Sequence, residues 1–361
     1  MGTDLKRLLI LLSEVNGSDQ LEDLLIRLSE QDFQAKIMIV GDESSELVQN
    51  LRKAKLDVGL MSPFKLRFFF RNYPHLLKEL LLNRPHTVLA SGQSATYLGM
   101  PVSWILRVPK RIHIRHHSNF HHKFNHKNGV LADRLMNFCS TTIVAVSELV
   151  KEILLQDEKC KVSKIQVIHN GVRLEKYTST RVRTEEKITF GAVSRFTELK
   201  GLKYLASAFV RFYEVYPDSH LEIIGAFSDS YQTVSSILSN LPENSYTLKS
   251  SHPEISSFMK SLDCFLHIPI GPYDESFGLV YIEALASGSN CIFTKSGILL
   301  EIQNIEDYAT IVPPCDDAAL FSAMLSVAKR EKATTKIPTN ELEKYSTRTM
   351  VENYLTLLKD T

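Results

Sequence analysis

The sequence is poor in cysteine and has no excess of charge of either sign. Among 361 residues, 42 Lys and Arg face 41 Asp and Glu. The resulting formal net charge of +1 predicts no general attraction to nucleic acid or to an acidic surface. The five cysteines are scattered and never follow C-x-x-C spacing, which argues against a disulfide framework and against a zinc site. We expect reduced thiols in the core.

Long apolar runs are also missing. The opening stretch MGTDLKRLLILLSEV is too short to span a bilayer and has no small-residue cleavage site, so we expect a cytoplasmic protein. No short repeat or low-complexity tract is found. The length exceeds that of one ordinary core and predicts two domains of roughly 150 to 200 residues.

The first half contains short β-rich runs separated by helical stretches. The runs are continuously apolar or β-branched, as strands covered on both faces require. They span residues 7–13, 35–41, 87–91, 111–117 and 141–147. Residues 18–31 and 66–82 have apolar side chains at helical spacing. This alternation predicts βαβ units and hence a parallel sheet.

The same pattern starts again in the second half. A predicted helix at 201–217 stops at Pro217. Strand-like runs span residues 187–194, 219–225, 261–269 and 290–294. The segment between the halves, 169–187, is polar, contains Asn-Gly and has no apolar period, which is typical of a linker.

We therefore predict an α/β protein of two Rossmann-like domains whose parallel sheets face one another across a cleft. The first covers residues 1–170 and the second residues 187–340, with a linker at 171–186. Ligands of such sheets bind beyond the carboxyl ends of the strands, where helix N-termini point. The expected site is the cleft between the domains.

The stretch YDESFGLVYIEALASG, residues 273–288, predicts a buried helix that carries carboxylates. Apolar residues from Phe277 onward follow the i, i+3, i+4 pattern, and Gly288 stands at the expected C-cap. Ser276 is the candidate N-cap. Glu283 falls on the side away from the sheet, where an ionised carboxylate needs donors such as Arg, Lys or ligand hydroxyls.

The start of this helix is a candidate anion site. The first-turn amides of Phe277, Gly278 and Leu279 lack intrahelical partners. Glu275 precedes them, and one interpretation is that it only complements the helix dipole while Glu283 holds a structural salt bridge.

Two nearby cations favour the anion site over the purely structural interpretation. Arg195 and Lys200 lie between the first strand and the first helix of the second domain, at a carboxyl end of the sheet. Arg can bind phosphate through two donors, and Lys supplies a mobile charge. Together with the helix start and the carboxylates, they predict a site for a sugar linked to a diphosphate.

The motifs SRFTELKG, HNGV and ESFGLVYIEALASG, in this order, resemble the retaining nucleotide-sugar-dependent glycosyltransferases of the GT-B type, the group 1 family. The resemblance spans nearly the whole chain. It implies that Glu283 binds ribose hydroxyls, that Glu275 contacts the donor sugar, and that Arg195 and Lys200 hold the diphosphate. It also implies that the C-terminal helix, 341–361, returns to the first domain.

The implied activity is hexosyl transfer with retention, from a nucleotide-diphosphate donor to a hydroxyl of a glycan or lipid-linked acceptor, in polysaccharide or glycoconjugate biosynthesis. The donor, UDP- or GDP-linked, is a substrate, and no cofactor or metal is expected because two cations and a helix start already neutralise the phosphates. Two alternatives stay open: an epimerase or hydrolase of nucleotide sugars, and a non-catalytic subunit that binds them.

The segment RIHIRHHSNFHHKFNH is rich in histidine. A metal site would need carboxylate or thiolate ligands that the segment lacks, and a nucleic-acid surface would need more Lys and Arg. Simple packing at a strand end is expected for some of them: His113, His121, His122 and His126. His116 and His117 end a predicted strand, and the resemblance implies that a histidine here contacts the donor sugar. We assign His117 first and His116 second.

The sequence departs from the family pattern at three loops. The first loop, VNGSDQ, has only Gly17 where paired glycines are common, and Gly17 is our candidate for backbone contact with the donor. Arg173 stands where Asp is usual after NGV. Residues 296–302, SGILLEI, replace a Gly-Gly-x-x-Glu type turn.

Residues 62–82 combine Lys65, Arg67 and Arg71 with three phenylalanines. A core helix with solvated charges is the favoured interpretation. The other is an interfacial helix that places the enzyme peripherally on the inner face of an anionic membrane.

Overall fold

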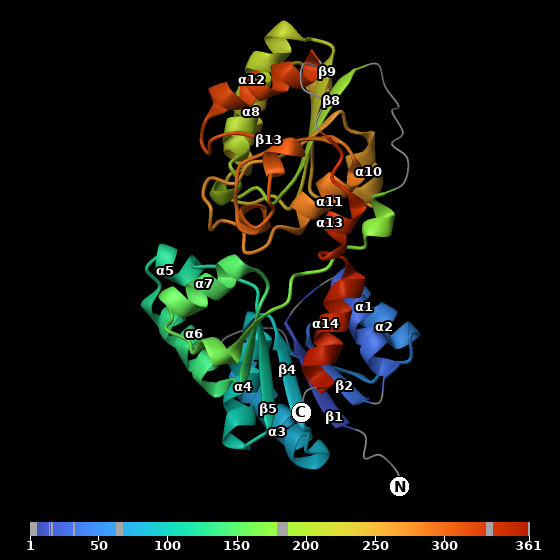
Figure 1. Ribbon diagram of the computed structural model, residues 1–361, viewed down its shortest axis with the longest axis vertical. Coiled ribbons are helices and arrows are strands. Elements are labelled where there is room, and N and C mark those ends of the chain that lie inside the picture. Colours follow the sequence, from blue (N-terminus) through green and yellow to red (C-terminus); the bar gives the residue numbers. More distant parts are fainter. Residues whose placement is uncertain are drawn as a thin grey trace. The chain divides into compact units, whose positions relative to one another are not determined.

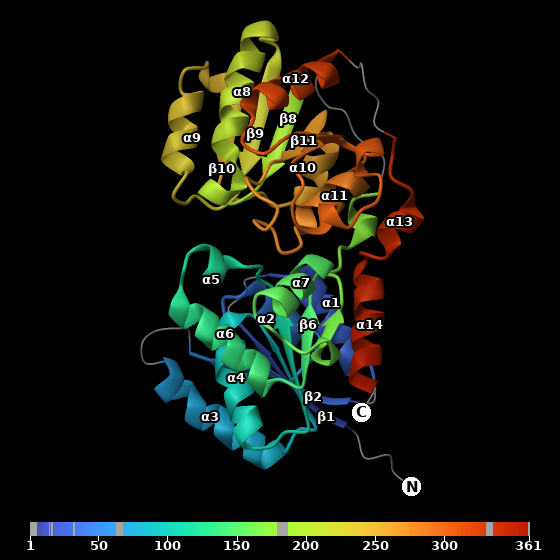
Figure 2. The ribbon, with the colours of Figure 1, turned by 60° about the vertical axis from the view of Figure 1, so that its left-hand side comes forward.

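The computed structural model describes residues 6–13, 15, 17–31, 33–62, 68–178, 187–329 and 335–359. The chain divides into two compact units (Figures 1 and 2). Unit 1 comprises residues 1–171 and 345–361, and unit 2 comprises residues 172–344. Over the described ranges, no helix is both long and apolar enough to cross a bilayer.

Unit 1 is built on a seven-stranded parallel sheet in the order β3-β2-β1-β4-β5-β6-β7. Its strands are β1 Lys6–Leu12, β2 Phe33–Val40, β3 Val58–Met61, β4 Thr87–Ser91, β5 Lys110–Arg115, β6 Thr142–Ala145 and β7 Ile165–Val167. Its helices are α1 Asp19–Ser29, α2 Glu46–Lys53, α3 Phe68–Asn83, α4 Gln93–Ile105, α5 Phe120–Lys123, α6 Lys127–Cys139, α7 Glu148–Gln156 and α14 Thr347–Lys359.

Unit 2 repeats this plan with six parallel strands in the order β10-β9-β8-β11-β12-β13. Its strands are β8 Ile188–Val193, β9 Ser219–Ile224, β10 Tyr246–Lys249, β11 Cys264–His267, β12 Asn290–Phe293 and β13 Thr310–Ile311. Its helices are α8 Leu202–Val215, α9 Tyr231–Leu238, α10 Ile255–Ser261, α11 Leu279–Ser287, α12 Asp317–Ala328 and α13 Thr339–Glu343.

Burial on both faces explains why the central strands read as continuous apolar runs. Every residue from Leu8 to Leu12 in β1 is at most 4% exposed, because helices cover the sheet on both sides. In unit 2, Phe190 packs edge-to-face on Phe209 and on Phe212 in the core.

Each sheet reverses its strand order at one point, and polar residues collect there. In unit 1 the reversal lies between β1 and β4, and in unit 2 it lies between β8 and β11. Connections leave these neighbouring strands toward opposite sides, which opens a crevice at their carboxyl ends. The fold thus places the loops after β4, β8 and β11 where a ligand of each sheet would bind.

The C-terminal helix α14 belongs to unit 1 (Figure 2). It packs beside α1, and Lys110 of β5 donates a hydrogen bond from Nζ to the Leu357 carbonyl. Its inward side is apolar, with Met350, Val351 and Tyr354 buried.

The predicted strands are confirmed as elements, and their ends differ from the predicted ones by at most three residues. Four further strands, β3, β7, β10 and β13, were not predicted. They are two to four residues long, and none of their side chains except Met61 is fully buried, so their sequences lack the longer apolar run that marks a central strand. Within the predicted 62–82 segment, Lys65 and Arg67 lie outside the described residues.

Gly171 provides a test of the α14 contact. A Cβ at this position would lie 2.5 Å from the Thr347 Cα and 2.9 Å from the Thr347 nitrogen, so Gly171→Ala must displace backbone. We expect a loss of about 1–3 kcal/mol, seen as a lower midpoint in urea or thermal unfolding. Gly59→Ala is the matched control, because its nearest atoms are 3.8 Å away. Equal midpoints for the two variants would contradict this packing.

Candidate functional site

The switch point of unit 2 holds a buried cluster of Lys200, Glu275 and His267. Lys200 ends a 3-10 turn after β8, His267 is the last residue of β11, and Glu275 lies in the loop that leads to α11. The Glu275 Oε1 atom accepts from Lys200 Nζ at 2.5 Å and from His267 Nε2 at 2.7 Å. The three side chains are 12%, 14% and 2% exposed for Lys200, Glu275 and His267.

The cluster keeps the carboxylate ionised although it is buried. Burial alone would raise the pKa of Glu275, but the hydrogen bond from His267 and the charge of Lys200 outweigh it and lower the pKa to about 2. Burial also lowers the pKa of His267, which is therefore neutral at pH 7. Since an ionised carboxylate only accepts, the His267 proton is on Nε2. Both bonds end on Oε1, and Oε2 has no partner among the described residues.

The loop at 296–298 fixes the backbone around Glu275. The Glu275 amide donates to Ser296 Oγ at 3.0 Å, and the Ile298 amide donates to the Phe277 carbonyl at 2.8 Å. Gly297 has φ +55°, and a Cβ there would lie 2.5 Å from the Phe277 oxygen. Only glycine fits this left-handed position against neighbouring backbone. Residues 296–298, which belong to the segment that departs from the family pattern, thus hold the backbone that carries the Glu275 carboxylate.

Helix α11 begins later than predicted. Gly278, with φ +83°, is the N-cap in place of Ser276, and the Tyr281 amide already donates to the Gly278 carbonyl at 3.1 Å. The amides at the helix start are therefore those of Gly278, Leu279 and Val280. Phe277 lies before the helix, so the prediction that its amide belongs to the first turn was wrong. Gly288, with φ +73°, is the C-cap as predicted.

The remaining predicted residues of unit 2 lie in the loops that carry this cluster or in helix α11, which follows it in the chain. Arg195 follows β8, and its side chain is exposed and forms no ion pair with any described residue. Glu283 lies half-buried in the middle of α11. Phe277 is 2% exposed, so its ring is part of the core.

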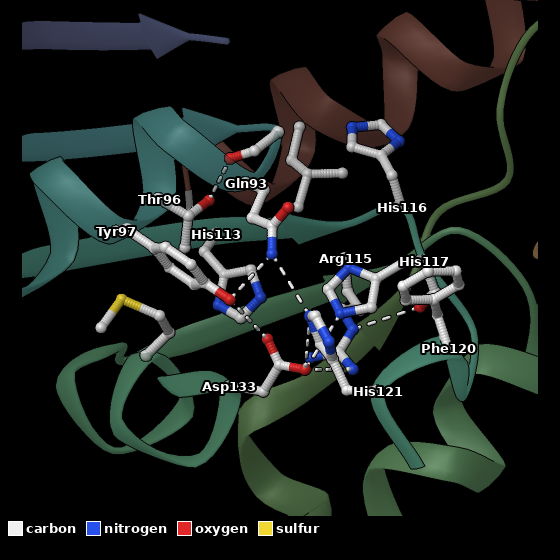
Figure 3. Close-up of a pocket in the computed structure, with 13 residues that line it drawn as sticks. Gln93, Thr96, Tyr97, His113, Arg115, His116, His117, Phe120, His121 and Asp133 are labelled. Atoms are coloured by element: carbon white, nitrogen blue, oxygen red, sulfur yellow. Dashed lines mark hydrogen bonds and ion pairs between the residues drawn. The ribbon is translucent and has the colours of Figure 1, made fainter. Parts of the chain in front are cut away.

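Unit 1 contains a pocket of about 250 Å³ at the carboxyl ends of β4 and β5 (Figure 3). His116 and His117 line it, but they follow β5, which ends at Arg115, and do not belong to the strand. His116 Nε2 lies 2.9 Å from Ser91 Oγ, and desolvation lowers the pKa of His116 to about 4. His117 is more open, with 31% of its side chain exposed.

Asp133 of α6 is the residue of this pocket that sequence reasoning missed. Its Oδ2 lies 3.1 Å from His117 Nε2 and 3.2 Å from the Arg115 guanidinium, and its Oδ1 accepts from the Tyr97 hydroxyl at 3.4 Å (Figure 3). One signal could have found it. Asp133 shares an inward stripe of α6 with Met136 and Asn137, and a carboxylate on a buried stripe needs partners.

The other histidines occupy different places from those predicted. His113 is in β5, where burial lowers its pKa to about 3 and its Nδ1 lies 3.2 Å from Ser140 Oγ. His121 and His122 are in the short helix α5, and His126 is the N-cap of α6, so these three do not pack at a strand end.

A metal ion would find suitable ligand types here. Donor atoms of His117, His121 and Asp133 lie within 4.8 Å of one another, so α6 supplies the carboxylate that the histidine segment lacks. The Arg115 guanidinium contacts the Asp133 oxygen that a metal would share, and its positive charge opposes a cation at that place. Gly17 is not among the residues that line this pocket; it lies between β1 and α1 and is exposed.

Comparison with known proteins matches both units to one enzyme class. The Glycosyltransferase Family 4 model matches residues 20–176, and the Glycosyl transferases group 1 model matches residues 175–344. The capsular polysaccharide biosynthesis glycosyltransferase CapM of Staphylococcus aureus is 26% identical, and the match covers 69% of this chain and 69% of that protein.

Solved structures confirm the fold class. HepE of Anabaena, in complex with UDP-glucose, has a TM-score of 0.82 at 17% identity, covering 98% of this chain and 100% of that one. Sucrose-phosphate synthase from Thermosynechococcus elongatus has a TM-score of 0.73 at 15% identity, covering 97% and 98%. At these identities the likeness establishes the two-domain α/β architecture alone.

The pKa of Glu275 leads to a test by acid titration. Ionised Glu275 stabilises the fold fully above its ordinary pKa of 4.5, and this contribution is lost as the pH falls toward about 2. At about 1.4 kcal/mol per pKa unit, its upper limit is about 3 kcal/mol. We expect the stability difference between wild type and Glu275→Gln to narrow from pH 5 to pH 2.5 in urea unfolding.

Glu198→Gln is the matched control for this titration. Glu198 pairs with Lys203 at 3.0 Å on the surface, where both side chains are more than a third exposed, so its removal should change stability little at any pH. If the difference in unfolding free energy between wild type and Glu275→Gln stays constant with pH, the pKa of Glu275 is the same in the folded and unfolded states.

Proposed function

The chain belongs to the group 1 glycosyltransferases, a retaining family that uses nucleotide-sugar donors, and we propose that it transfers a hexose to a hydroxyl of a glycan or lipid-linked acceptor. The observation that carries this proposal is the Lys200–Glu275–His267 cluster beside the first turn of α11, at the switch point of unit 2. It combines a cation for phosphate, free amides and a carboxylate with one open oxygen.

The reaction requires the protein to stabilise charge that develops in the transition state. Negative charge grows on the departing diphosphate while the sugar becomes oxocarbenium-like, and fixed donors stabilise such charge best. Lys200 has three N–H donors, and Glu275 and the Asp274 carbonyl, at 3.4 Å, leave one for a phosphate oxygen. The exposed Arg195 and the amides of Leu279 and Val280 add further donors. In this proposal no metal is needed.

We assign recognition of the sugar and ribose hydroxyls to the carboxylates of unit 2 and to residues of unit 1. Glu275 Oε2 accepts from a hydroxyl of the donor sugar, and Glu283 accepts from the ribose hydroxyls. His117 contacts a hydroxyl of the sugar, supported by His116, and the Gly17 backbone contributes to the same recognition. Ser276 and Gly278 shape the loop that presents the first amides of α11. Attack on the same face of the sugar as the departing diphosphate gives retention.

UDP is the nucleotide we propose first, because HepE was solved with UDP-glucose. CapM is named for capsular polysaccharide biosynthesis, which favours an acceptor in a polysaccharide or glycoconjugate pathway for this chain as well. The test is turnover of UDP- and GDP-hexoses with and without a bacterial lipid extract, with the anomeric configuration of the product read by NMR. Acceptor-independent release or rearrangement of the donor would favour a hydrolase or an epimerase instead.

A lipid-linked acceptor also requires access to a membrane surface, and three helices of unit 1 offer one. Their exposed apolar side chains follow helical stripes: Leu77, Leu81 and Leu82 on α3, Trp104 and Ile105 on α4, and Leu131, Leu135 and Phe138 on α6. The helices α3 and α6 both pack on α4, and the rings of Trp104 and Phe138 lie 5.6 Å apart. We call these eight residues the apolar face.

Charge on the three helices suits an anionic bilayer. Lys78 and Arg134 are exposed within the stripes of α3 and α6, and Arg107 follows α4. In the described part of these helices no acidic side chain is exposed, since Glu79 pairs with Lys36 at 2.8 Å and Asp133 is buried. The proposed membrane contact therefore extends beyond the predicted 62–82 segment, and it places the enzyme peripherally on the cytoplasmic face.

The role of Lys200 can be measured in the transfer assay. If its charge acts mainly as the diphosphate departs, Lys200→Ala lowers kcat by about 10²- to 10³-fold and changes the donor KM much less. Lys203→Ala is the control, because Lys203 is an exposed lysine on the next helix and pairs with Glu198. A raised KM at unchanged kcat would remove Lys200 from the transition-state role.

Vesicle flotation tests the apolar face. The protein should float with vesicles that contain phosphatidylglycerol at low salt, and the Trp104→Ser and Ile105→Ser double variant should float at least several-fold less because it loses interfacial apolar area. Val215→Ser is the control, since Val215 is 56% exposed in unit 2. Absence of wild-type flotation, or an equal loss in the control, would rule the contact out.

A further inference from the structure

The buried network behind His117 has no part in the roles given so far. Arg115 is its centre: the guanidinium forms a two-pronged pair with Glu158, from Nη1 to Oε2 at 3.2 Å and from Nη2 to Oε1. The same Nη2 lies 3.2 Å from Asp133 Oδ2. All three side chains are at most 3% exposed. Two carboxylates thus share one guanidinium, an arrangement that is costly to bury and gives weak support to stability.

Arg115 holds His117 in two ways. Its Nε donates to the His117 carbonyl at 3.1 Å, which fixes the backbone, and its Nη2 fixes the carboxylate to which the imidazole is bonded (Figure 3). Asp133 receives a further contact on its other oxygen from the Tyr97 hydroxyl. The carboxylate that meets His117 therefore cannot rotate freely.

This arrangement determines which nitrogen of His117 carries the proton. The buried Asp133 is ionised, and an ionised carboxylate accepts only, so the 3.1 Å contact requires a hydrogen on Nε2. In a ring that carries one proton, on Nε2, the lone pair is on Nδ1. That atom has no partner among the described residues, and the side chain is exposed to the pocket.

We propose that Asp133 is a positioning residue that holds His117 as the Nε2–H tautomer and so presents Nδ1 as a hydrogen-bond acceptor for a hydroxyl of the bound sugar. The catalytic part of this inference rests on the proposed transferase function. The geometric part, which is the assignment of the His117 proton to Nε2, does not depend on that function. A hydroxyl donor at this place would be recognised, whereas a group that only accepts would meet the Nδ1 lone pair and be rejected.

Substitutions of His117 can distinguish the two ring nitrogens. An Asn side chain places its carbonyl oxygen near the position of Nδ1, whereas a Gln side chain reaches the position of Nε2. His117→Asn should therefore keep more transfer activity than His117→Gln or His117→Ala. It should also be insensitive to loss of Asp133, since an amide needs no partner to select its acceptor.

The experiment combines a double-mutant cycle with a spectroscopic readout. Transfer is measured for wild type, Asp133→Ala, His117→Ala and the double variant. We expect Asp133→Ala to lower kcat/KM by about 10- to 100-fold, as loss of an orienting partner typically does. The double variant should be no worse than His117→Ala, because Asp133 acts through His117. Additive losses would overturn the proposal.

The tautomer is read by NMR of protein labelled with ¹⁵N-histidine, with His117→Ala used to assign the signals. Wild type should show His117 protonated on Nε2 and unprotonated on Nδ1, and Asp133→Ala should show a mixture. A protonated Nδ1 in wild type, or a bound metal that abolishes the Nε2 proton, would refute the assignment. If the protein transfers no sugar, the proposed function fails while the NMR result still decides the tautomer.

Two further variants complete the experiment: a conservative substitution of Asp133 and a matched control. Asp133→Asn keeps a carbonyl acceptor facing Arg115 and His117, so it should retain the tautomer and most of the activity even if Asp133→Ala does not fold. Asp157→Asn is the matched control, because Asp157 is an exposed carboxylate after α7 and its loss should leave both readouts unchanged. A larger loss in Asp133→Asn than in His117→Ala would also contradict the proposal.

Discussion

A carboxylate removed from water must be given donors, and this requirement shapes the polar regions of both units. In unit 2, one oxygen of Glu275 accepts from Lys200 and His267. In unit 1, one oxygen of Asp133 accepts from Arg115 and His117. Each set follows a strand at or beside the reversal of its parallel sheet, where connections diverge and leave room at the carboxyl ends.

The two sets differ in which member is left open. In unit 2 the histidine is 2% exposed and the carboxylate keeps a free oxygen, so the acid faces outward and the imidazole supports it. In unit 1 the carboxylate is 3% exposed and the histidine is 31% exposed, so the order is reversed. A basic side chain, a carboxylate and a histidine thus present an acceptor oxygen in unit 2 and an acceptor nitrogen in unit 1. Both atoms are suited to sugar hydroxyls.

How far the sequence predicts this protein depends on how local each signal is. The central strands, α8 and the Gly288 cap follow from apolar period and turn chemistry, which act between near neighbours. Lys200 and Glu275 were found because each stands in a recognisable loop. His267 and Asp133 were missed because their partners are 8 and 16 residues away in the chain and are brought close only by packing. Helix α11 starts later than predicted because Gly278, in a left-handed conformation, is its N-cap.

The position of α14 has a consequence for how the chain acquires its fold during synthesis. Residues 172–344 form unit 2 as one continuous segment, so that unit can fold as it leaves the ribosome. Unit 1 is completed by a helix that is made after unit 2, and until then the apolar surface that receives Met350, Val351 and Tyr354 stays in contact with water. Unit 1 therefore completes its fold after unit 2, and until α14 is made its uncovered apolar surface is of the kind that chaperones recognise.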